Sequence, residues 1–312
     1  MEQILISVVS PVYRAEQIID LLVQRISTEL EQITPHFEII LVEDGSPDGS
    51  WQKIAENCQR DPRVKGIKLS RNFGQHYAIT AGLTAARGEI TILMDCDLQD
   101  DPAHIHRLLA EQQKGYEIVF TKRIKRKHSF FKAITAKIYN ALFLLFSDKK
   151  YDINVGSLVL FTKKVRQHFV RIKDKDRLYI QILKWLGFAH TYIYVEHRER
   201  VEGVSTYSFL KLLKIAVQGW TSHSDKLLRL SIYLGFFLSF LSFLGIFLIV
   251  TLYFWQGFQS GWASLAVLNL FSTGIILICI GIAGLYIGKT FEQSKHKPLF
   301  IIDEVLNTKI DD

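Results

Sequence analysis

Short apolar runs alternate with amphipathic segments through the first 121 residues of the chain. Apolar residues at helical spacing predict helices over about Glu16–Ile33 and Gln75–Ala86. Short continuous apolar runs predict buried strands, and they cover Ile4–Val12, Phe37–Val42, Val64–Leu69, Glu89–Met94 and Tyr116–Thr121. This alternation of strand and helix indicates an α/β domain built on a parallel, doubly wound sheet.

Further strand patterns lie in the second half of the chain. They cover Ser157–Phe161, Thr191–Val195 and Leu299–Ile302, and the last of these is expected to dock on the α/β domain. The turn-forming run Asp44–Gly49 ends the second strand of the domain. Ligands of such sheets bind beyond the carboxyl ends of the strands, so the polar residues at those ends are the candidate site.

Two stretches without charged residues lie near the C-terminus, at Ser231–Trp255 and Ala263–Gly288. Each is longer than the roughly 20 residues that a helix needs to cross a bilayer, so two transmembrane helices are expected. The alternative is a pair of buried core helices. Basic residues flank the outer ends of the pair, at Lys226, Arg229, Lys289, Lys295 and Lys297. The positive-inside rule therefore predicts an integral membrane protein with both termini in the cytoplasm, in the inner membrane if the cell is bacterial.

Two further segments have the pattern of helices that lie on a membrane surface. Phe130–Phe146 is basic and then apolar, and Ser208–Trp220 mixes large apolar side chains with lysines. The alternative for the second segment is an ordinary amphipathic core helix. The expected organisation is a cytoplasmic domain at 1–207, interfacial helices at 208–230, a transmembrane hairpin at 231–289 and a cytoplasmic tail at 290–312.

The composition narrows the range of partners. The 312 residues carry a net charge of +7, with a pI near 9.1, which favours anionic lipid headgroups or phosphorylated substrates. No nucleic-acid recognition motif accompanies the charge, so nucleic acid is not an expected partner. The cysteines Cys58, Cys96 and Cys279 stand far apart and form neither a zinc-binding pattern nor a disulfide framework.

The acidic run Asp95–Asp101 follows the apolar fourth strand. In an extended segment, residues two apart point the same way, so the side chains of Asp95, Asp97 and Gln99 converge. Three oxygen ligands favour a hard cation, Mg2+ or Mn2+. The alternative is a solvated loop that caps the next helix, with Asp101 as N-cap and Pro102 at the first helical position. Capping explains Asp101 but leaves Asp95 and Asp97 unexplained.

With these motifs in view, the chain resembles glycosyltransferase family 2, and within it the polyprenyl-phosphate sugar transferases similar to dolichol-phosphate-mannose synthase. The matching blocks are Val8–Tyr13, Val42–Ser46, Ser70–Gly74, Asp95–Asp100 and Arg200–Tyr207, all in the family's order and ahead of the paired apolar stretches. The resemblance covers nearly the whole chain. It implies a GT-A (Rossmann-like) fold, an enzyme that binds a nucleotide-sugar, and an acceptor that carries a phosphate.

The resemblance also implies roles for individual residues. It places the nucleotide base and ribose against Pro11, Tyr13, Glu16 and Asp44, counts Arg71 among the substrate-binding residues, and assigns the metal to Asp95, Asp97 and Gln99. It makes Asp97, Arg123 and Arg200 the catalytic candidates, with Ser205 and Lys137 beside the acceptor phosphate. Arg123 opens the basic run 122–127, whose alternative interpretation is a solvated loop that touches anionic lipid.

The chain departs from the family pattern at several positions. Many relatives carry Gly-Asp-Phe-Arg-Leu where this chain has Gly156–Leu160, so Ser157 replaces the acid proposed as a base. Thr206 stands where a lysine is common, Glu43 replaces an aspartate and Arg14 replaces an asparagine. A phosphate acceptor is mostly ionised at neutral pH and needs little deprotonation, so the loss of a base is compatible with catalysis.

The expected reaction is inverting transfer of one sugar from a nucleotide-sugar to a polyprenyl phosphate at the cytoplasmic leaflet, with membrane lipids as further partners and a homo-oligomer plausible. The first rival is a processive polysaccharide synthase, but the chain lacks the Q-x-x-R-W signature. A second rival is an inactive nucleotide-binding scaffold, which Ser157 and Val159 suggest and the intact Asp95 and Asp97 oppose. A dinucleotide-binding oxidoreductase is disfavoured because no G-x-G-x-x-G follows the first strand.

Overall fold

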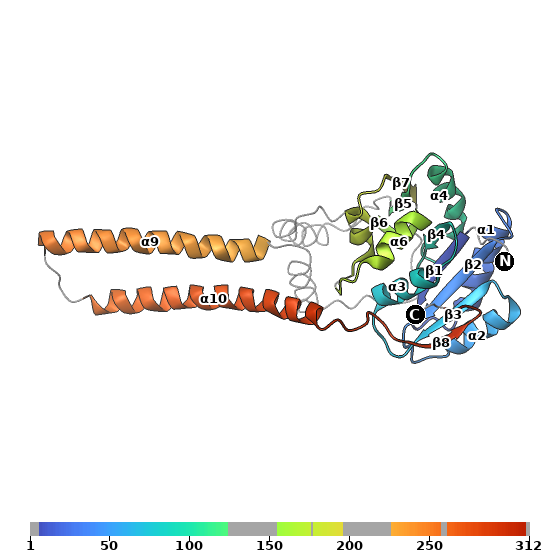
Figure 1. Cartoon of the computed structure of the whole chain (residues 1–312), viewed down its shortest axis with the longest axis horizontal. Coiled ribbons are helices and arrows are strands. Elements are labelled where there is room, and N and C mark those ends of the chain that lie inside the picture. The colour runs from blue at the N-terminus through green and yellow to red at the C-terminus, as the bar shows by residue number, and fades with distance from the viewer. Residues whose placement is uncertain (1–5, 124–154, 176, 196–225, 257–260, 310–312) are drawn as a thin grey trace, which may run out of the picture. The chain divides into compact units, whose positions relative to one another are not determined.

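The computed structural model describes residues 6–123, 155–175, 177–195, 226–256 and 261–309. Residue contacts divide the chain into two compact units. The first comprises Met1–Arg126, Asp152–Val204 and Lys297–Asp312, and the second comprises Lys127–Tyr151 and Ser205–His296. The first unit is an α/β domain, and the described part of the second is a pair of long helices (Figure 1).

An eight-stranded sheet is the framework of the α/β unit, in the order β7-β5-β6-β4-β1-β2-β3-β8. Its strands are β1 (Ile6–Val12), β2 (Phe37–Glu43), β3 (Val64–Leu69), β4 (Ile90–Leu93), β5 (Ile118–Arg123), β6 (Val155–Thr162), β7 (His190–Val195) and β8 (Ile302–Leu306). Seven of the expected strands overlap observed ones along most of their length, whereas the expected Leu299–Ile302 overlaps β8 at Ile302 alone. The α/β class is therefore confirmed.

The sheet is mixed, so the prediction of a wholly parallel sheet is wrong. β6 runs antiparallel to β4 and β5, between which it lies, and β8 runs antiparallel to β3. The other strands run parallel to one another. The apolar pattern of a buried strand is the same in either direction, so the sequence identified β6 and β8 without fixing their orientation.

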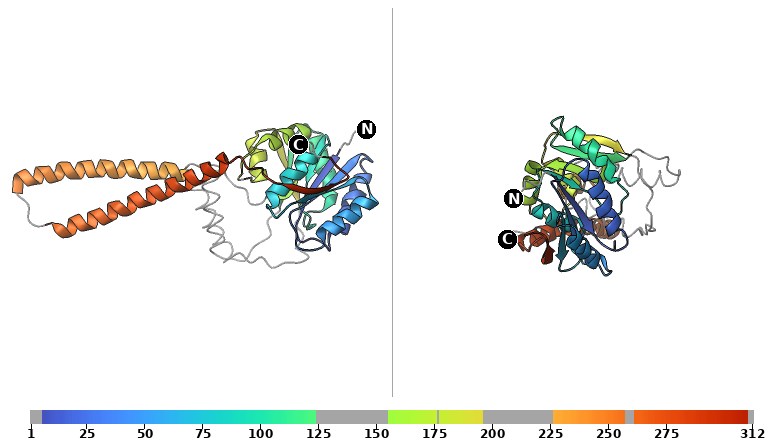
Figure 2. Two further views of the ribbon diagram at one scale, coloured as in Figure 1. Left: turned by 60° about the horizontal axis from the view of Figure 1, so that its bottom comes forward. Right: turned by 90° about the vertical axis from the view of Figure 1, so that its right-hand side faces the viewer.

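Helices cover both faces of this sheet (Figure 2). They are α1 (Ile19–Glu31), α2 (Ser50–Arg60), α3 (Gln75–Ala85), α4 (Ile105–Gln112), preceded by the short helix η1 (Pro102–His104), α6 (Lys163–Arg171) and α7 (Tyr179–Trp185). Adjacent residues of β1 face opposite sides: Val8 packs in the core beneath α1, and Val9 packs in the core beneath α3. The sheet is thus buried on both faces, which accounts for its almost uninterrupted apolar strands.

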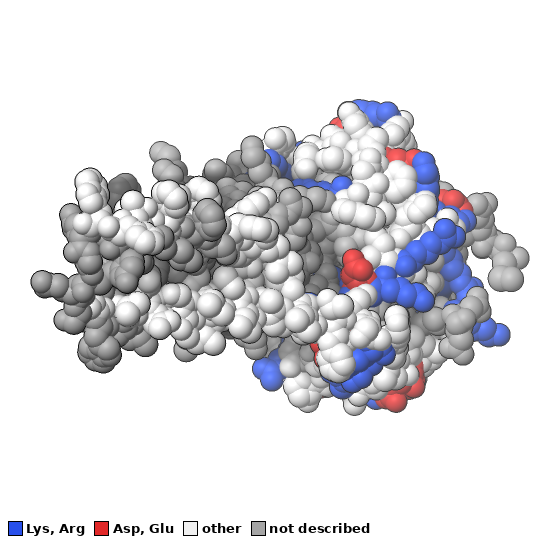
Figure 3. All heavy atoms as spheres, turned by 60° about the vertical axis from the view of Figure 1, so that its left-hand side comes forward, with Lys and Arg blue, Asp and Glu red and all other residues white. Residues whose placement is uncertain are grey.

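The second unit contains the helices α9 (Lys226–Gln256) and α10 (Trp262–Ser294), which include the two charge-free stretches. They contact each other, and the Cys279 thiol of α10 donates to the Ser231 carbonyl of α9 at 3.6 Å. Among the described residues, one helical segment, Phe271–Ser294, is long enough and apolar enough to cross a membrane. In Figure 3 the described residues of the pair show as white, uncharged spheres along most of its length. Two spans, rather than one, remain a prediction.

Several predictions fall outside the described residues. These are the segments Phe130–Phe146 and Ser208–Trp220, most of the basic run after Arg123, and the candidate acceptor residues Lys137, Arg200 and Ser205.

Candidate functional site

Two loops at the carboxyl ends of β1 and β2 interlock through hydrogen bonds. The Ser46 hydroxyl accepts from the Arg14 amide at 2.8 Å, and the Glu16 carboxylate accepts from the Gly49 amide at 3.0 Å. Tyr13, next to Arg14, is 44% exposed, and Pro11 is buried on β1. Pro11, Tyr13 and Glu16, which are predicted to bind the nucleotide, therefore lie together at the carboxyl ends of β1 and β2. We call this part of the sheet edge the corner.

Asp44 links this corner to the loop that follows β3. Its carboxylate accepts from the amides of Phe73 at 2.7 Å and Gly74 at 2.9 Å. Burial raises the pKa of the Asp44 carboxyl, although these two amides and the Arg71 guanidinium oppose the shift. Arg71 itself stacks on the ring of Phe73, 4.0 Å from its centroid. The structure thus brings Asp44 and Arg71 together, as the resemblance implies.

The backbone at this corner leaves no room for larger side chains. Gly45 has a φ of +61°, and a Cβ there would stand 2.2 Å from the amide nitrogen of Asn72. Arg14 and Leu98 also adopt positive φ values, of 52° and 53°. Such values cost a non-glycine residue conformational energy and tend to occur at functional sites. The φ of Arg14 lies in the left-handed region, which asparagine tolerates better than most residues.

The acidic segment after β4 gathers three carboxylates near one another. Asp95 accepts from the side-chain amide of Gln75 at 2.7 Å, at the first turn of α3. Burial raises the pKa of Asp95 to about 6; a hydrogen bond from Ser157 opposes the shift, whereas the charges of Asp97 and Asp100 add to it. Burial and the Asp95 charge also raise the pKa of the intervening Cys96 thiol to about 12, so this thiol is not a nucleophile.

Ser157 and Asp100 hold this segment against β6. The Ser157 hydroxyl donates to Asp100 Oδ2 at 2.7 Å, and the Leu158 amide donates to the same oxygen at 3.2 Å. A Cβ at Gly156 would stand 2.4 Å from the Thr121 hydroxyl, so β5 and β6 approach closely here. From the sequence, Ser157 was identified only as a replacement for an acidic residue, and Asp100 was given no role. Their partnership is a long-range contact that the order of residues does not reveal.

Arg123 ends β5, whose carboxyl end lies at the same edge of the sheet as the carboxyl end of β4. Its Nε is buried and has no hydrogen-bond partner among the described residues. A buried guanidinium nitrogen without an acceptor is costly, and an anionic ligand would satisfy it. This observation fits the expected contact of Arg123 with a phosphate.

The oxygen donors of the acidic segment decide whether a divalent cation fits there. Among the described residues, no group of three or more His, Cys, Asp or Glu side chains is arranged to hold a metal ion. Asp95 and Asp97 nevertheless form a pair of carboxylates whose mutual repulsion raises the Asp95 pKa. The Asp97 carboxylate accepts from the Gln99 amide nitrogen at 3.1 Å, so this segment is a turn rather than an extended strand. Two hard oxygen donors fit a cation that completes its shell with water and phosphate.

Comparisons with known proteins identify the family of the chain. The sequence pattern of Glycosyl transferase family 2 matches residues 7–169, which span β1 to most of α6. An uncharacterized glycosyltransferase, YkcC of Bacillus subtilis (strain 168), is 36% identical over 96% of this chain and 93% of its own length. The chain belongs to glycosyl transferase family 2 and is a glycosyltransferase.

Two relatives carry more specific names. The bactoprenol glucosyl transferase of Shigella phage SfV is 34% identical over 95% of this chain and 97% of its own. The undecaprenyl-phosphate 4-deoxy-4-formamido-L-arabinose transferase of Proteus mirabilis (strain HI4320) is 33% identical over 97% and 94%. Among solved structures, a mannosyltransferase of Pyrobaculum calidifontis in complex with GDP-Man and Mn2+ aligns with 94% of this chain and 88% of its own, at 15% identity and a TM-score of 0.48.

Proposed function

We propose that this protein transfers one sugar from a nucleotide-sugar to a polyprenyl phosphate, releasing a nucleoside diphosphate and inverting the anomeric configuration. The observation that carries the proposal is similarity along nearly the full chain to two relatives named for bactoprenol or undecaprenyl phosphate. The candidate membrane span Phe271–Ser294 supports it, because such an acceptor resides in the bilayer.

On the donor side, the corner formed by Tyr13, Glu16 and Asp44 would hold the nucleoside. Asp44 is buried and already fixed by the amides of Phe73 and Gly74, so it is preorganised to accept hydrogen bonds from a ribose. Arg71 beside it offers a cation near the donor phosphates.

The acidic segment would lie between donor and acceptor. Asp95 and Asp97, with Gln99 as a further candidate, would hold Mg2+ or Mn2+. The two carboxylates lie close enough for the charge of Asp97 to act on the buried Asp95. The bound ion would neutralise charge on the departing diphosphate. Ser157, through Asp100, would keep the carboxylates in position.

On the acceptor side, Arg123 would bind the polyprenyl phosphate through the buried Nε that lacks a partner among the described residues. Arg200, Ser205 and Lys137 are further candidates from the family resemblance. The acceptor oxygen is ionised at neutral pH, so a serine at position 157 in place of an acid is compatible with its attack on the anomeric carbon. Orientation and charge stabilisation would then supply most of the acceleration.

In the membrane, α9 and α10 would form a hairpin with the α/β unit on the cytoplasmic side. The basic residues that flank the charge-free stretches support this orientation. The enzyme would thereby meet the phosphate of its lipid acceptor at the cytoplasmic leaflet.

The acceptor assignment is tested with purified full-length protein, Mn2+ and radiolabelled nucleotide-sugars. Undecaprenyl phosphate is one acceptor, and undecaprenol, which lacks the phosphate, is the matched control. We expect label in the organic phase with the phosphate only. Equal incorporation into undecaprenol, or incorporation into a soluble acceptor alone, would overturn the assignment.

A further inference from the structure

The C-terminal strand β8 completes the sheet beside β3. It pairs antiparallel with that strand, with Ile67 opposite Val305 and Lys68 opposite Glu304. Ile302 packs against the core under α3, and Leu306 packs against the core on the other face. Residues 297–309 thus belong to the α/β unit although α10 separates them from it in sequence. We call residues 300–307 the strap.

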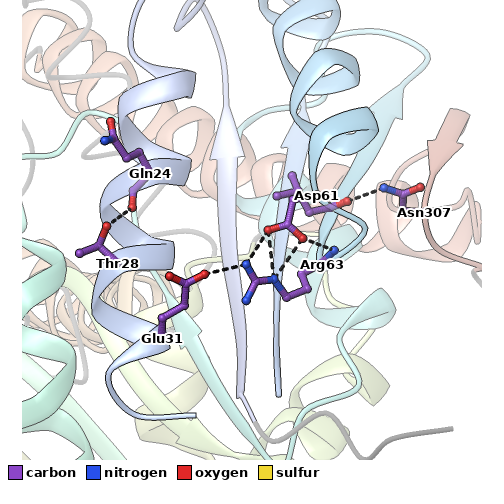
Figure 4. Close-up of polar contacts among 7 residues, drawn as sticks. Gln24, Thr28, Glu31, Asp61, Arg63 and Asn307 are labelled. Atoms are coloured by element: carbon purple, nitrogen blue, oxygen red, sulfur yellow. Dashed lines mark hydrogen bonds and ion pairs between the residues drawn. The ribbon is translucent and has the colours of Figure 1, made fainter. Parts of the chain in front are cut away.

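Side-chain contacts fasten the strap along its length. The Trp51 indole donates to Glu304 at 3.1 Å, and Lys68 pairs with Asp303 at 3.2 Å. Asn307 donates to the carbonyls of Cys58 at 2.6 Å and Val64 at 2.9 Å, at the turn between α2 and β3. Figure 4 shows Asn307 beside Asp61 and Arg63 of this turn. Near this turn Arg63 is fixed by Asp61 and Glu31. One end of the strap is therefore anchored on a rigid part of the domain.

The other end of the strap reaches residues 70–74, which we call the donor loop. The Ile301 carbonyl accepts from the Ser70 amide at 3.0 Å, one residue beyond the end of β3. The following residues, 71–74, lie against the Asp44–Gly45 turn, where Phe73 and Gly74 donate to the Asp44 carboxylate. Phe73 and Phe300 both pack against the core beneath α3. An unbroken series of contacts thus runs from the strap through β3 to Asp44.

Without the strap, β3 would be an edge strand with unpaired backbone groups. Edge strands fray more readily than paired ones, and the segment that fraying reaches first is the one beyond the last ladder bond. Here that segment is the donor loop, whose amides position a buried carboxylate. The loop backbone lies so close to Gly45 that a Cβ there would stand 2.2 Å from the Asn72 amide nitrogen, so a small displacement of the loop would alter its contacts with the Asp44–Gly45 turn.

We propose that the strap is a positioning element for the nucleotide-sugar site, which holds the 70–74 loop so that Asp44 is oriented for the donor. The inference rests on the proposed function for the identity of the donor site. It adds that donor affinity depends on residues that follow the C-terminal helix α10 and touch no substrate.

A pair of matched substitutions in the full-length protein tests this. Ile302→Asn places an amide where the strap packs on the core, and Val305→Asn makes the same change at a strap position that is 37% exposed. Hydrogen exchange of the peptide covering residues 70–74 is the first readout. We expect its exchange to speed up about tenfold or more in Ile302→Asn and to stay near the wild-type rate in Val305→Asn.

Donor kinetics are the second readout. Ile302→Asn should raise the donor KM several-fold with a much smaller change in kcat, because the loop binds the donor and takes no part in bond breaking. Dissociation constants for UDP and GDP, each with Mn2+, give the same comparison without an acceptor. If wild type transfers no sugar to undecaprenyl phosphate, the proposed function fails, while the exchange readout still decides the positioning role.

A gentler variant covers the case in which Ile302→Asn fails to fold. Trp51→Phe keeps an aromatic ring, smaller than the indole, and removes the donor of the bond to Glu304. It should shift exchange at residues 70–74 in the same direction by a smaller factor. The proposal is overturned if β3 and the strap exchange faster in either variant while residues 70–74 remain protected, or if the donor KM stays unchanged.

Discussion

At the scale of single residues, the acidic segment after β4 contains a carboxyl whose ionisation opposes folding. A carboxyl with a pKa near 6 is mostly ionised at neutral pH, although its surroundings favour the neutral form. The resulting cost in folding free energy is absent below about pH 4 and fully present above about pH 6. A protein retains such a residue when its charge is needed, and here the need would be a cation and a departing diphosphate.

The first prediction concerns Asp95→Asn. In EDTA, the variant should be more stable than wild type by about 1–3 kcal/mol at pH 8, because it removes a charge whose ionisation opposes folding. The difference in thermal midpoint should shrink as pH falls below 6, where Asp95 becomes protonated. Transferase activity should fall roughly a hundredfold or more. Unfolding scans at pH 4.5 and pH 8 check the sign, and an equal stability difference at both would contradict it.

Ser157 gives the second prediction. Ser157→Ala leaves Asp100 with the Leu158 amide and should cost about 1 kcal/mol of stability through the lost hydrogen bond. The Mn2+ concentration for half-maximal activity should rise several-fold, because the carboxylates are held less firmly. Ser157→Thr keeps the hydroxyl and is the control. It should keep the wild-type Mn2+ dependence. Equal Mn2+ dependence in Ser157→Ala and wild type would make the residue merely structural.

At the scale of elements, the sequence foretold most strands and fewer helices. Buried strands such as β3 are short, continuous apolar runs, and the observed bounds Val64–Leu69 equal the expected ones. The pattern gave no sign of α2, because Ser50–Arg60 is mostly polar and includes Ser50 and Asn57 among its buried positions. Those polar residues satisfy loops and neighbouring helices, a demand of tertiary structure that periodicity does not record.

The positions of the candidate site residues could be predicted in part, and their functional roles stay predictions. Asp44, Asp95 and Asp97 lie at strand ends, and strand ends can be located from sequence. The partners that fix them, Gln75, Asp100 and Ser157, come from other elements and required the structure. Convergence of Asp95, Asp97 and Gln99 by strand alternation was an oversimplification, because the segment turns after Asp95.

The turn after β2 gives the third prediction. Gly45→Ala combines a positive φ with a Cβ that would meet the Asn72 amide at 2.2 Å, so the two loops must separate. We expect a loss of roughly 1–3 kcal/mol of stability and a clear rise in the donor KM. Gly115→Ala, at a glycine of similarly positive φ with nothing within 4 Å of the added Cβ, is the control for backbone strain alone. The control should lose stability without a change in donor KM; equal KM effects in both would exclude a specific loop contact.

At the scale of the whole molecule, the chain joins an α/β transferase unit to a helical unit through its middle and its tail. The described residues contain one candidate span, and the proposed hairpin requires a second in α9. The two arrangements differ in which parts of the chain share a side of the membrane, so topology is decidable by labelling.

Single cysteines at Thr28, Ser260 and His296, in a background without the native cysteines, give the fourth prediction. A membrane-impermeant maleimide on intact cells should label position 260 alone, because a hairpin places positions 28 and 296 together in the cytoplasm. Labelling of all three after permeabilisation is the control. A single span through α10 would instead place 28 and 260 on one side and 296 on the other, and it would separate β8 from β3, with which β8 pairs.

The central claim is the transfer of one sugar to a polyprenyl phosphate. It is tested most directly by mass spectrometry of the lipid fraction, after the purified full-length protein is incubated with undecaprenyl phosphate, Mg2+ or Mn2+ and a panel of nucleotide-sugars. We predict a lipid heavier by one sugar residue with one donor, formed only when the metal is present. A ladder of several sugars on one lipid, or an unmodified lipid with every donor, would contradict the account.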